Sequence, residues 1–128
     1  MVCLNSKDAT RVPLTVAEKE LLVEAGLGEK KVTIDDMSCS PQDFKAAIVS
    51  TFPKLEDCGG FELLRCLPHG LKKLEPISAA VAQYPKLLKS VVGNGRVFIR
   101  PIQKDLSLRQ DENLTNAIQV FTIILTYF

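Results

Sequence analysis

Two segments of similar design constrain the fold of this chain more than any other feature of its sequence. Gly59-Gly60 leads into 61–66, and Gly95 leads into 96–102. The glycines free the backbone at the start of each segment, and the residues that follow are mostly apolar and favour an extended conformation. A third segment, 30–35, is rich in β-branched residues and alternates in polarity. The sequence therefore predicts three strands.

One clear helix is predicted between the strands at 30–35 and 61–66. Ser40 is a suitable N-cap, and Pro41 fits the first helical position. Apolar residues then recur at helical spacing as far as Phe52. Pro53 ends the helix, because the residue before a proline resists the α conformation. We therefore expect a helix over 41–52 that packs across the sheet.

The residues before the first predicted strand allow two interpretations. Thr15 and Glu18 have the spacing of a capping box, in which both side chains bond backbone amides at the start of a helix. We therefore expect a helix over 16–25. The alternative is a hairpin, in which a strand at 20–25 turns back and pairs with 30–35.

The remainder of the chain gives less regular signals. The segment 71–77 predicts an edge strand, because Pro76 cannot donate a hydrogen bond to a sheet ladder. The pattern of 78–92 is ambiguous between helix and irregular structure, and Pro85 interrupts it. The apolar segment 117–128 is shorter than the twenty or so residues that span a membrane, so we interpret it as an additional strand.

These elements together predict one α+β domain. Their order over 30–102 parallels that of a ubiquitin-like β-grasp, a mixed sheet with one main helix packed across it, although a clear first strand is missing. Either 20–25 or the C-terminal segment would supply that strand. We expect a disordered N-terminus at 1–13, the ubiquitin-like domain at 14–108 and an apolar tail at 109–128.

The charge balance gives little support for a nucleic-acid or membrane partner. The chain carries 16 basic and 15 acidic side chains, a net charge of +1. Nucleic-acid-binding domains usually show a basic excess on one face, and membrane docking uses a similar excess. The first residues lack the apolar core of a secretion signal. We therefore expect a cytoplasmic or nuclear protein whose four cysteines are reduced.

No group of residues has the spacing of a catalytic or metal site. His69 is the only histidine, and no nucleophile lies at a recognisable spacing from it. Cys58 and Cys66 are the candidates for a catalytic thiol, but no basic residue directly flanks Cys58. The cysteines lack C-x-x-C spacing, and the adjacent Asp35 and Asp36 would point to opposite faces of a strand. We therefore expect no enzyme activity, no metal and no cofactor.

One strand offers a candidate binding surface. Because side chains alternate along a strand, Arg96, Phe98 and Arg100 are predicted to share one face. Arginine and aromatic residues are enriched at the hot spots of protein interfaces, so this face is a candidate site for a protein partner. A nucleic acid is the alternative ligand. Phe98 could equally belong to the core, with Arg100 extending along the surface. A C-terminal strand with an unpaired edge would add a homodimer contact.

Four segments of the chain carry a resemblance to a known family. They are Ala25–Gly28, Phe52–Leu55, Gly59–Arg65 and Phe98–Leu106. These segments resemble a region of fish HECT-type ubiquitin ligases similar to the G2/M-phase-specific ubiquitin-protein ligase. That region lies upstream of the catalytic HECT domain, and the resemblance covers residues 14–108. The chain has no counterpart of the HECT domain itself, and none of its cysteines takes the catalytic role. The resemblance implies an accessory, ubiquitin-like interaction module with a protein partner from the ubiquitin system.

Overall fold

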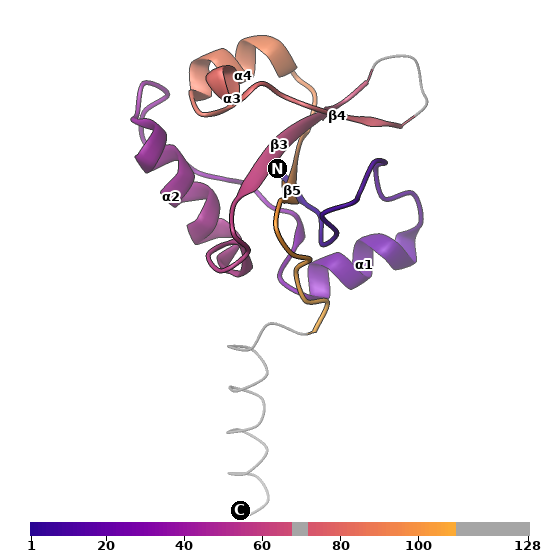
Figure 1. Ribbon diagram of the computed structural model, residues 1–128. Coiled ribbons are helices and arrows are strands. Elements are labelled where there is room, and N and C mark those ends of the chain that lie inside the picture. Colours follow the sequence, from indigo (N-terminus) through magenta and orange to yellow (C-terminus); the bar gives the residue numbers. More distant parts are fainter. Residues whose placement is uncertain (68–71, 110–128) are drawn as a thin grey trace, which may run out of the picture.

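The computed structural model describes residues 1–67 and 72–109, which form a five-stranded mixed sheet with helices on both of its faces (Figure 1). The strands are β1 (Val2–Cys3), β2 (Gly28–Glu29), β3 (Phe61–Cys66), β4 (Leu74–Pro76) and β5 (Val97–Pro101). The helices are α1 (Val16–Glu24), α2 (Pro41–Thr51), α3 (Ala79–Ala82) and α4 (Pro85–Val92), with a short 3-10 helix at Pro53–Leu55. The predicted α+β class is confirmed.

The strands lie in the order β2-β1-β5-β3-β4, so the N-terminal strand is inside the sheet. β1 runs parallel to β5, with Val2 opposite Phe98, and antiparallel to β2. β3 is antiparallel to both β5 and β4. We expected residues 1–13 to be disordered, but Val2 and Cys3 form a strand that is buried between β2 and β5. The apolar run Val2–Leu4 is too short to stand out in a periodicity analysis.

The helix expected over 16–25 is confirmed by α1. Its N-cap is Thr15, whose Oγ1 accepts a hydrogen bond from the backbone N–H of Glu18 at 3.1 Å. The Glu18 carboxylate in turn accepts from the backbone N–H of Leu14 at 3.0 Å. This exchange satisfies the Glu18 amide, which the first turn of a helix cannot bond internally, and the Leu14 amide just before the helix. The alternative hairpin, with a strand at 20–25, is wrong.

Other elements that depend on local signals also occur where they were predicted. α2 begins after Ser40, whose Oγ accepts from the N–H of Asp43 at 3.1 Å. The two glycine-led segments form β3 and β5, which pair from Phe61 opposite Pro101 onward. β4 is an edge strand, as expected for 71–77. The ambiguous region 78–92 contains α3 and α4, which are separate helices because the second begins at Pro85.

The strand predicted at 30–35 is wrong, because β2 ends at Glu29 and none of 30–35 belongs to a strand. The next residue, Lys30, lies opposite Met1. The Lys30 N–H donates to the Met1 carbonyl at 2.8 Å, and the Met1 amine donates to the Lys30 carbonyl at 2.7 Å. Val32 and Ile34 therefore have no β1 residue opposite them. Their side chains still pack against the core, so the predicted alternation describes burial and not pairing.

Both faces of the sheet are covered. Leu63 lies opposite Ile99, and the next pair along is Leu64 opposite Phe98. Because successive side chains in a strand point to opposite faces, these two pairs lie on different sides, and all four residues are buried. α2 covers the Leu63 face, as the predicted helix was expected to do. The β1–β2 connection (residues 4–27, including α1) covers the Phe98 face, and Figure 1 shows α1 and α2 on opposite sides.

The β1–β2 connection also reaches the far edge of the sheet. The backbone N–H of Val12 donates to the carbonyl of Lys72, and the N–H of Leu74 donates to the carbonyl of Thr10, both at 2.9 Å. The connection therefore crosses from β1 to β4 and occupies hydrogen-bonding groups that an edge strand would otherwise expose.

Two sequence predictions fall outside the part of the chain that the structure describes. The loop that holds His69 lies in 68–71, and the proposed C-terminal strand lies in 110–128. Among the helices of residues 1–67 and 72–109, none combines the length and the apolar character required to cross a bilayer.

Candidate functional site

The predicted face of Arg96, Phe98 and Arg100 is largely covered, and only Arg96 is exposed on it. Phe98 is 3% exposed and belongs to the core beneath the β1–β2 connection. Arg96 is exposed at the start of β5 and forms an ion pair with Glu29 at 3.1 Å. The side chain of Arg100 is only 14% exposed. The alternative interpretation, in which Phe98 is a core residue, therefore describes the structure.

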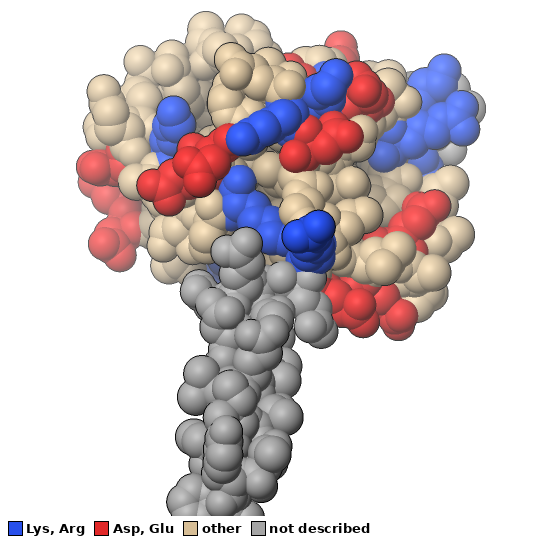
Figure 2. All heavy atoms as spheres, turned by 60° about the horizontal axis from the view of Figure 1, so that its bottom comes forward, with Lys and Arg blue, Asp and Glu red and all other residues tan. Residues whose placement is uncertain are grey.

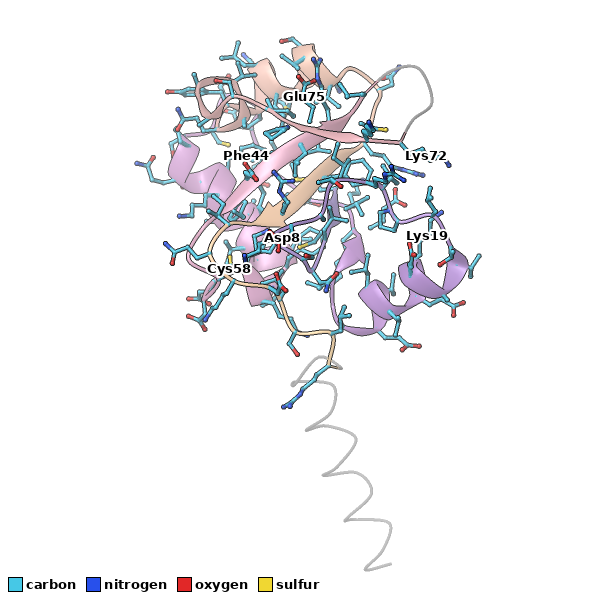
Figure 3. The ribbon with its side chains drawn as sticks, turned by 45° about the vertical axis from the view of Figure 1, so that its right-hand side comes forward. Asp8, Lys19, Phe44, Cys58, Lys72 and Glu75 are labelled. Atoms are coloured by element: carbon cyan, nitrogen blue, oxygen red, sulfur yellow. The ribbon has the colours of Figure 1, made fainter. Side chains whose placement is uncertain are left out.

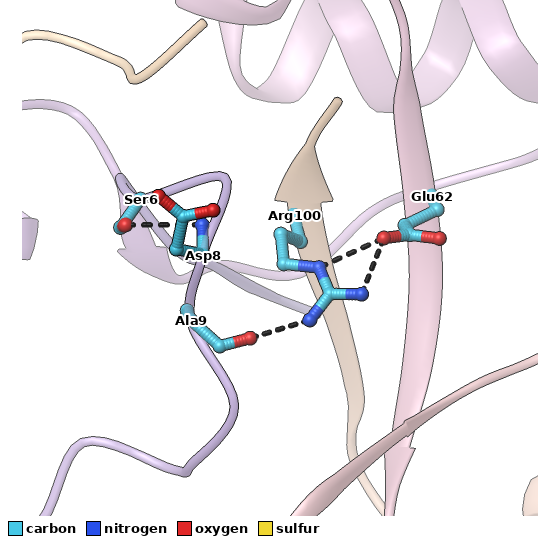
Figure 4. Close-up of polar contacts among 5 residues, drawn as sticks. All are labelled: Ser6, Asp8, Ala9, Glu62 and Arg100. Atoms are coloured by element: carbon cyan, nitrogen blue, oxygen red, sulfur yellow. Dashed lines mark hydrogen bonds and ion pairs between the residues drawn. The ribbon is translucent and has the colours of Figure 1, made fainter. Parts of the chain in front are cut away.

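Arg100 joins three segments of the chain (Figure 4). Its Nε donates a hydrogen bond to Glu62 Oε1 on β3 at 2.8 Å, and its Nη2 donates to the same oxygen. Its Nη1 donates to the backbone carbonyl of Ala9 in the β1–β2 connection. Beside it, the N–H of Asp8 donates to Ser6 Oγ at 3.2 Å and closes a turn. Arg100 thus fastens the connection to the sheet, which is a structural role.

An open groove of about 530 Å³ lies between α2 and α3, with β3 as its floor. This volume lies within the range of roughly 300–1,000 Å³ that is usual for ligand sites. We call it the α2–α3 groove. Its apolar lining consists mainly of Phe44 and Ile48 from α2, Phe61 and Leu63 from β3, and Ala79 and Ala82 from α3.

The rim of the α2–α3 groove is polar and carries an uncompensated positive charge. Lys45 and Glu62 both line it. The carboxylate of Glu62 is engaged by Arg100, whereas Lys45 is exposed and forms no ion pair with any residue in 1–67 or 72–109. Gln42 and Gln83 add side-chain amides that can donate and accept hydrogen bonds. The groove therefore combines an apolar floor with polar groups at its margin.

A second opening, of about 690 Å³, lies on the other face of the sheet between α1 and the start of β5. We call it the α1–β5 cavity. Lys19, Lys72, Arg96 and Glu29 line it, together with Phe98. Two of the three residues of the predicted binding face therefore line one cavity, although Arg100 does not line it.

The cysteines occupy contrasting environments. Burial raises the pKa of the Cys3 thiol to about 12, and the nearby Cys58 thiol adds to the rise. Cys58 is also buried, and its Sγ donates to the carbonyls of Leu55 and Gly60, both at 3.0 Å. Cys66 is exposed. Within the described ranges, no three residues among His, Cys, Asp and Glu gather as a metal site would require. The candidate thiol Cys58 is therefore a packed, hydrogen-bonded core residue.

The α2–α3 groove could not be predicted from the sequence, because its lining comes from elements that are distant in the chain. Alternation does place Phe61 and Leu63 on one face of a strand, but it does not show that α2 and α3 leave part of that face open. The same reason applies to Lys19, which reaches its cavity only because the β1–β2 connection folds over the sheet. No family model, no curated protein and no solved structure matches the chain. The resemblance to ubiquitin ligases therefore stays a prediction.

Proposed function

We propose that this chain is a non-enzymatic protein-interaction module with a ubiquitin-like β-grasp fold. The sheet supports the fold assignment, since the first and last strands run parallel side by side and the helix after the second strand crosses one face. Antiparallel neighbours such as β1 and β2 can be joined by a two-residue hairpin. Here residues 4–27 join them instead and cover the second face. The first face keeps the α2–α3 groove.

The α2–α3 groove is the observation that carries the proposed function. Covering apolar surface contributes about 25 cal/mol per Å², and an apolar floor with a polar margin is typical of interaction sites. Ile102, which is 52% exposed, extends the apolar surface at one end of the groove. A matching partner would place an apolar side chain on the floor formed by Phe61 and Leu63. A carboxylate of the same partner would lie beside Lys45.

We propose further that the partner belongs to the ubiquitination machinery and that the protein acts in the cytoplasm or nucleus. The support for this partner class is the resemblance of residues 14–108 to the region upstream of a HECT domain. The alternative of a nucleic-acid-binding domain relied on the face of Arg96, Phe98 and Arg100. That alternative loses its surface, because Phe98 and Arg100 are covered.

Binding to purified proteins tests the proposal. Ala79 and Ala80 are adjacent exposed residues of α3, and only Ala79 lines the groove. The full chain would be immobilised and exposed to ubiquitin, to ubiquitin-activating and ubiquitin-conjugating enzymes and to a ubiquitin ligase. Ala79→Arg should weaken binding by about tenfold or more, because the new side chain fills the groove, and Ala80→Arg should change it by less than about twofold.

Two results would overturn the proposal. In one, none of these proteins binds the unaltered chain. In the other, the two variants bind equally well, which would show that the bound surface is not the α2–α3 groove. Circular dichroism of both variants confirms that any loss does not come from unfolding.

A further inference from the structure

We propose that the α1–β5 cavity binds an acidic peptide segment that carries an apolar side chain. The cavity lies on the opposite face of the sheet from the α2–α3 groove, so this proposal does not depend on the proposed function. Its volume of about 690 Å³ is sufficient for a short peptide segment. The evidence is the combination of converging cations with an apolar floor.

Three cations from separate parts of the fold converge on this cavity. Lys19 comes from α1, Lys72 lies just before β4, and Arg96 lies just before β5. Figure 3 shows Lys19 and Lys72 on the same side of the molecule, on these two elements. Glu29 compensates Arg96 through their 3.1 Å ion pair. Lys19 and Lys72 form no ion pair with a residue in the described ranges, so the cavity has a surplus of positive charge.

The surface between these cations is apolar. Val2, Leu22 and Phe98 are buried at its base, and Val23 lies at its wall with 57% of its surface exposed. An aliphatic side chain placed there would remove Val23 from water and fill space above the buried residues. Carboxylates on either side of that side chain would then reach the two lysines. The cavity therefore matches a peptide in which acidic residues flank an apolar one.

A peptide fits this cavity better than a nucleic acid does. Single-stranded nucleic acids bind by stacking bases on exposed aromatic rings along a basic groove. Phe98 is the aromatic residue of this lining, and it is 3% exposed. On the face shown in Figure 2, basic and acidic side chains are interspersed, and the whole chain carries a net charge of +1. Neither observation describes a basic stripe that could follow a phosphate backbone.

The test measures fluorescence anisotropy with the full chain and a labelled pentapeptide of four glutamates around a central leucine. Lys19→Glu and Lys72→Glu should each weaken binding by about tenfold or more, because each reverses a charge at the cavity. Lys89→Glu is the matched control, since Lys89 is an exposed lysine of α4 that does not line the cavity. It should change affinity by less than about twofold. A peptide with glutamines in place of the glutamates should not bind.

The chain also contains an internal reporter for this site. Cys66 is exposed and lines the cavity, whereas Cys39 is a half-buried cysteine that does not line it. Saturating peptide should slow alkylation of Cys66 and leave Cys39 unchanged. The proposal is overturned if the acidic peptide shows no saturable binding, or if Lys89→Glu weakens it as much as the cavity variants do. It is also overturned if the cavity variants lose binding of a short oligothymidine while the peptide never binds.

Discussion

Two arginines on neighbouring strands each pair with a glutamate, but in different surroundings. The side chains of Arg100 and Glu62 are 14% and 34% exposed. Those of Arg65 and Glu75 are 41% and 45% exposed, and the Arg65 Nη2 lies 3.2 Å from the Glu75 Oε2. Exposed ion pairs contribute little because water and salt screen them, whereas a half-buried group that loses its donor regains only part of its hydration.

This contrast predicts unequal costs for two similar substitutions. Arg100→Ala should lower the free energy of unfolding by about 2–3 kcal/mol, because it leaves Glu62 and the Ala9 carbonyl without their donor. Arg65→Ala should lower it by less than about 1 kcal/mol. Urea denaturation of both variants measures the difference. Equal costs would show that Arg100 does not fasten the β1–β2 connection.

The buried thiol of Cys3 predicts a dependence of stability on pH. Its pKa is raised to about 12, chiefly by burial, whereas a cysteine in an unfolded chain has a pKa of about 8.5. Below that lower pH both states hold the proton, so the stabilisation by Cys3 is fully present. Above it the unfolded state releases its proton while the native state keeps it, so the free energy of unfolding falls as the pH rises toward 12.

A Cys3→Ala variant isolates this effect. The free energy of unfolding, measured in urea near neutral pH and again at about pH 10, should decline less in the variant than in the unaltered chain. The comparison uses the slope with pH, so the cost of removing the buried side chain does not affect it. Identical declines in the two proteins would show that the Cys3 thiol does not cause the pH dependence.

At the scale of elements, α1 is attached to the sheet by a narrow strip of its surface. Leu22 is 5% exposed, whereas its neighbours Leu21 and Val23 are 50% and 57% exposed. Adjacent residues in a helix of 3.6 residues per turn point in different directions, so one leucine enters the core and the next does not. The cover over Phe98 therefore depends strongly on a single side chain of α1.

Adjacent leucines of α1 should consequently respond differently to truncation. Leu22→Ala should cost about 2–5 kcal/mol, the usual range for a buried leucine. Leu21→Ala should cost less than about 1 kcal/mol, because little of its contact surface is lost. Chemical denaturation monitored by circular dichroism measures both. Similar costs would mean that α1 does not sit on the sheet through Leu22.

Elements that depend on their own residues could be predicted from the sequence, and elements that depend on a distant partner could not. Thr15 and Ser40 form caps with residues three positions ahead, and Pro85 acts on its own helix, so these signals are complete within a short window. A strand also needs a partner. The segment 30–35 has a strand-like pattern, but beyond Lys30 it has no partner strand. Val2–Cys3 has almost no strand-like pattern, but it lies between two partner strands.

The candidate site was only partly predictable for the same reason. Alternation along β5 identifies Arg96, Phe98 and Arg100 as residues of one face. The β1–β2 connection crosses one face because of contacts between residues far apart in the chain, such as that between Arg100 and Ala9. No local sequence pattern encodes such contacts. The open part of the opposite face, beside Phe61, depends in turn on where α3 begins relative to α2.

At the scale of the whole molecule, two openings lie on opposite faces of one sheet. α2 and α3 flank the first, and the β1–β2 connection borders the second. The sheet separates them, so a protein in the α2–α3 groove and a peptide in the α1–β5 cavity would not compete for space. One module would then hold two segments of a larger assembly, a role that suits an accessory domain of a ubiquitin ligase.

Partner binding in the α2–α3 groove can be measured most directly by photo-crosslinking in cells. A benzoylphenylalanine in place of Ala79 lies in the groove, and the same probe in place of Ala80 lies next to it on the exposed side of α3. Mass spectrometry of the crosslinked products should find ubiquitin, a ubiquitin-conjugating enzyme or a ubiquitin ligase with the probe at position 79 and not at position 80. Capture of the same proteins from both positions, or of no ubiquitination protein from position 79, would contradict the proposed function.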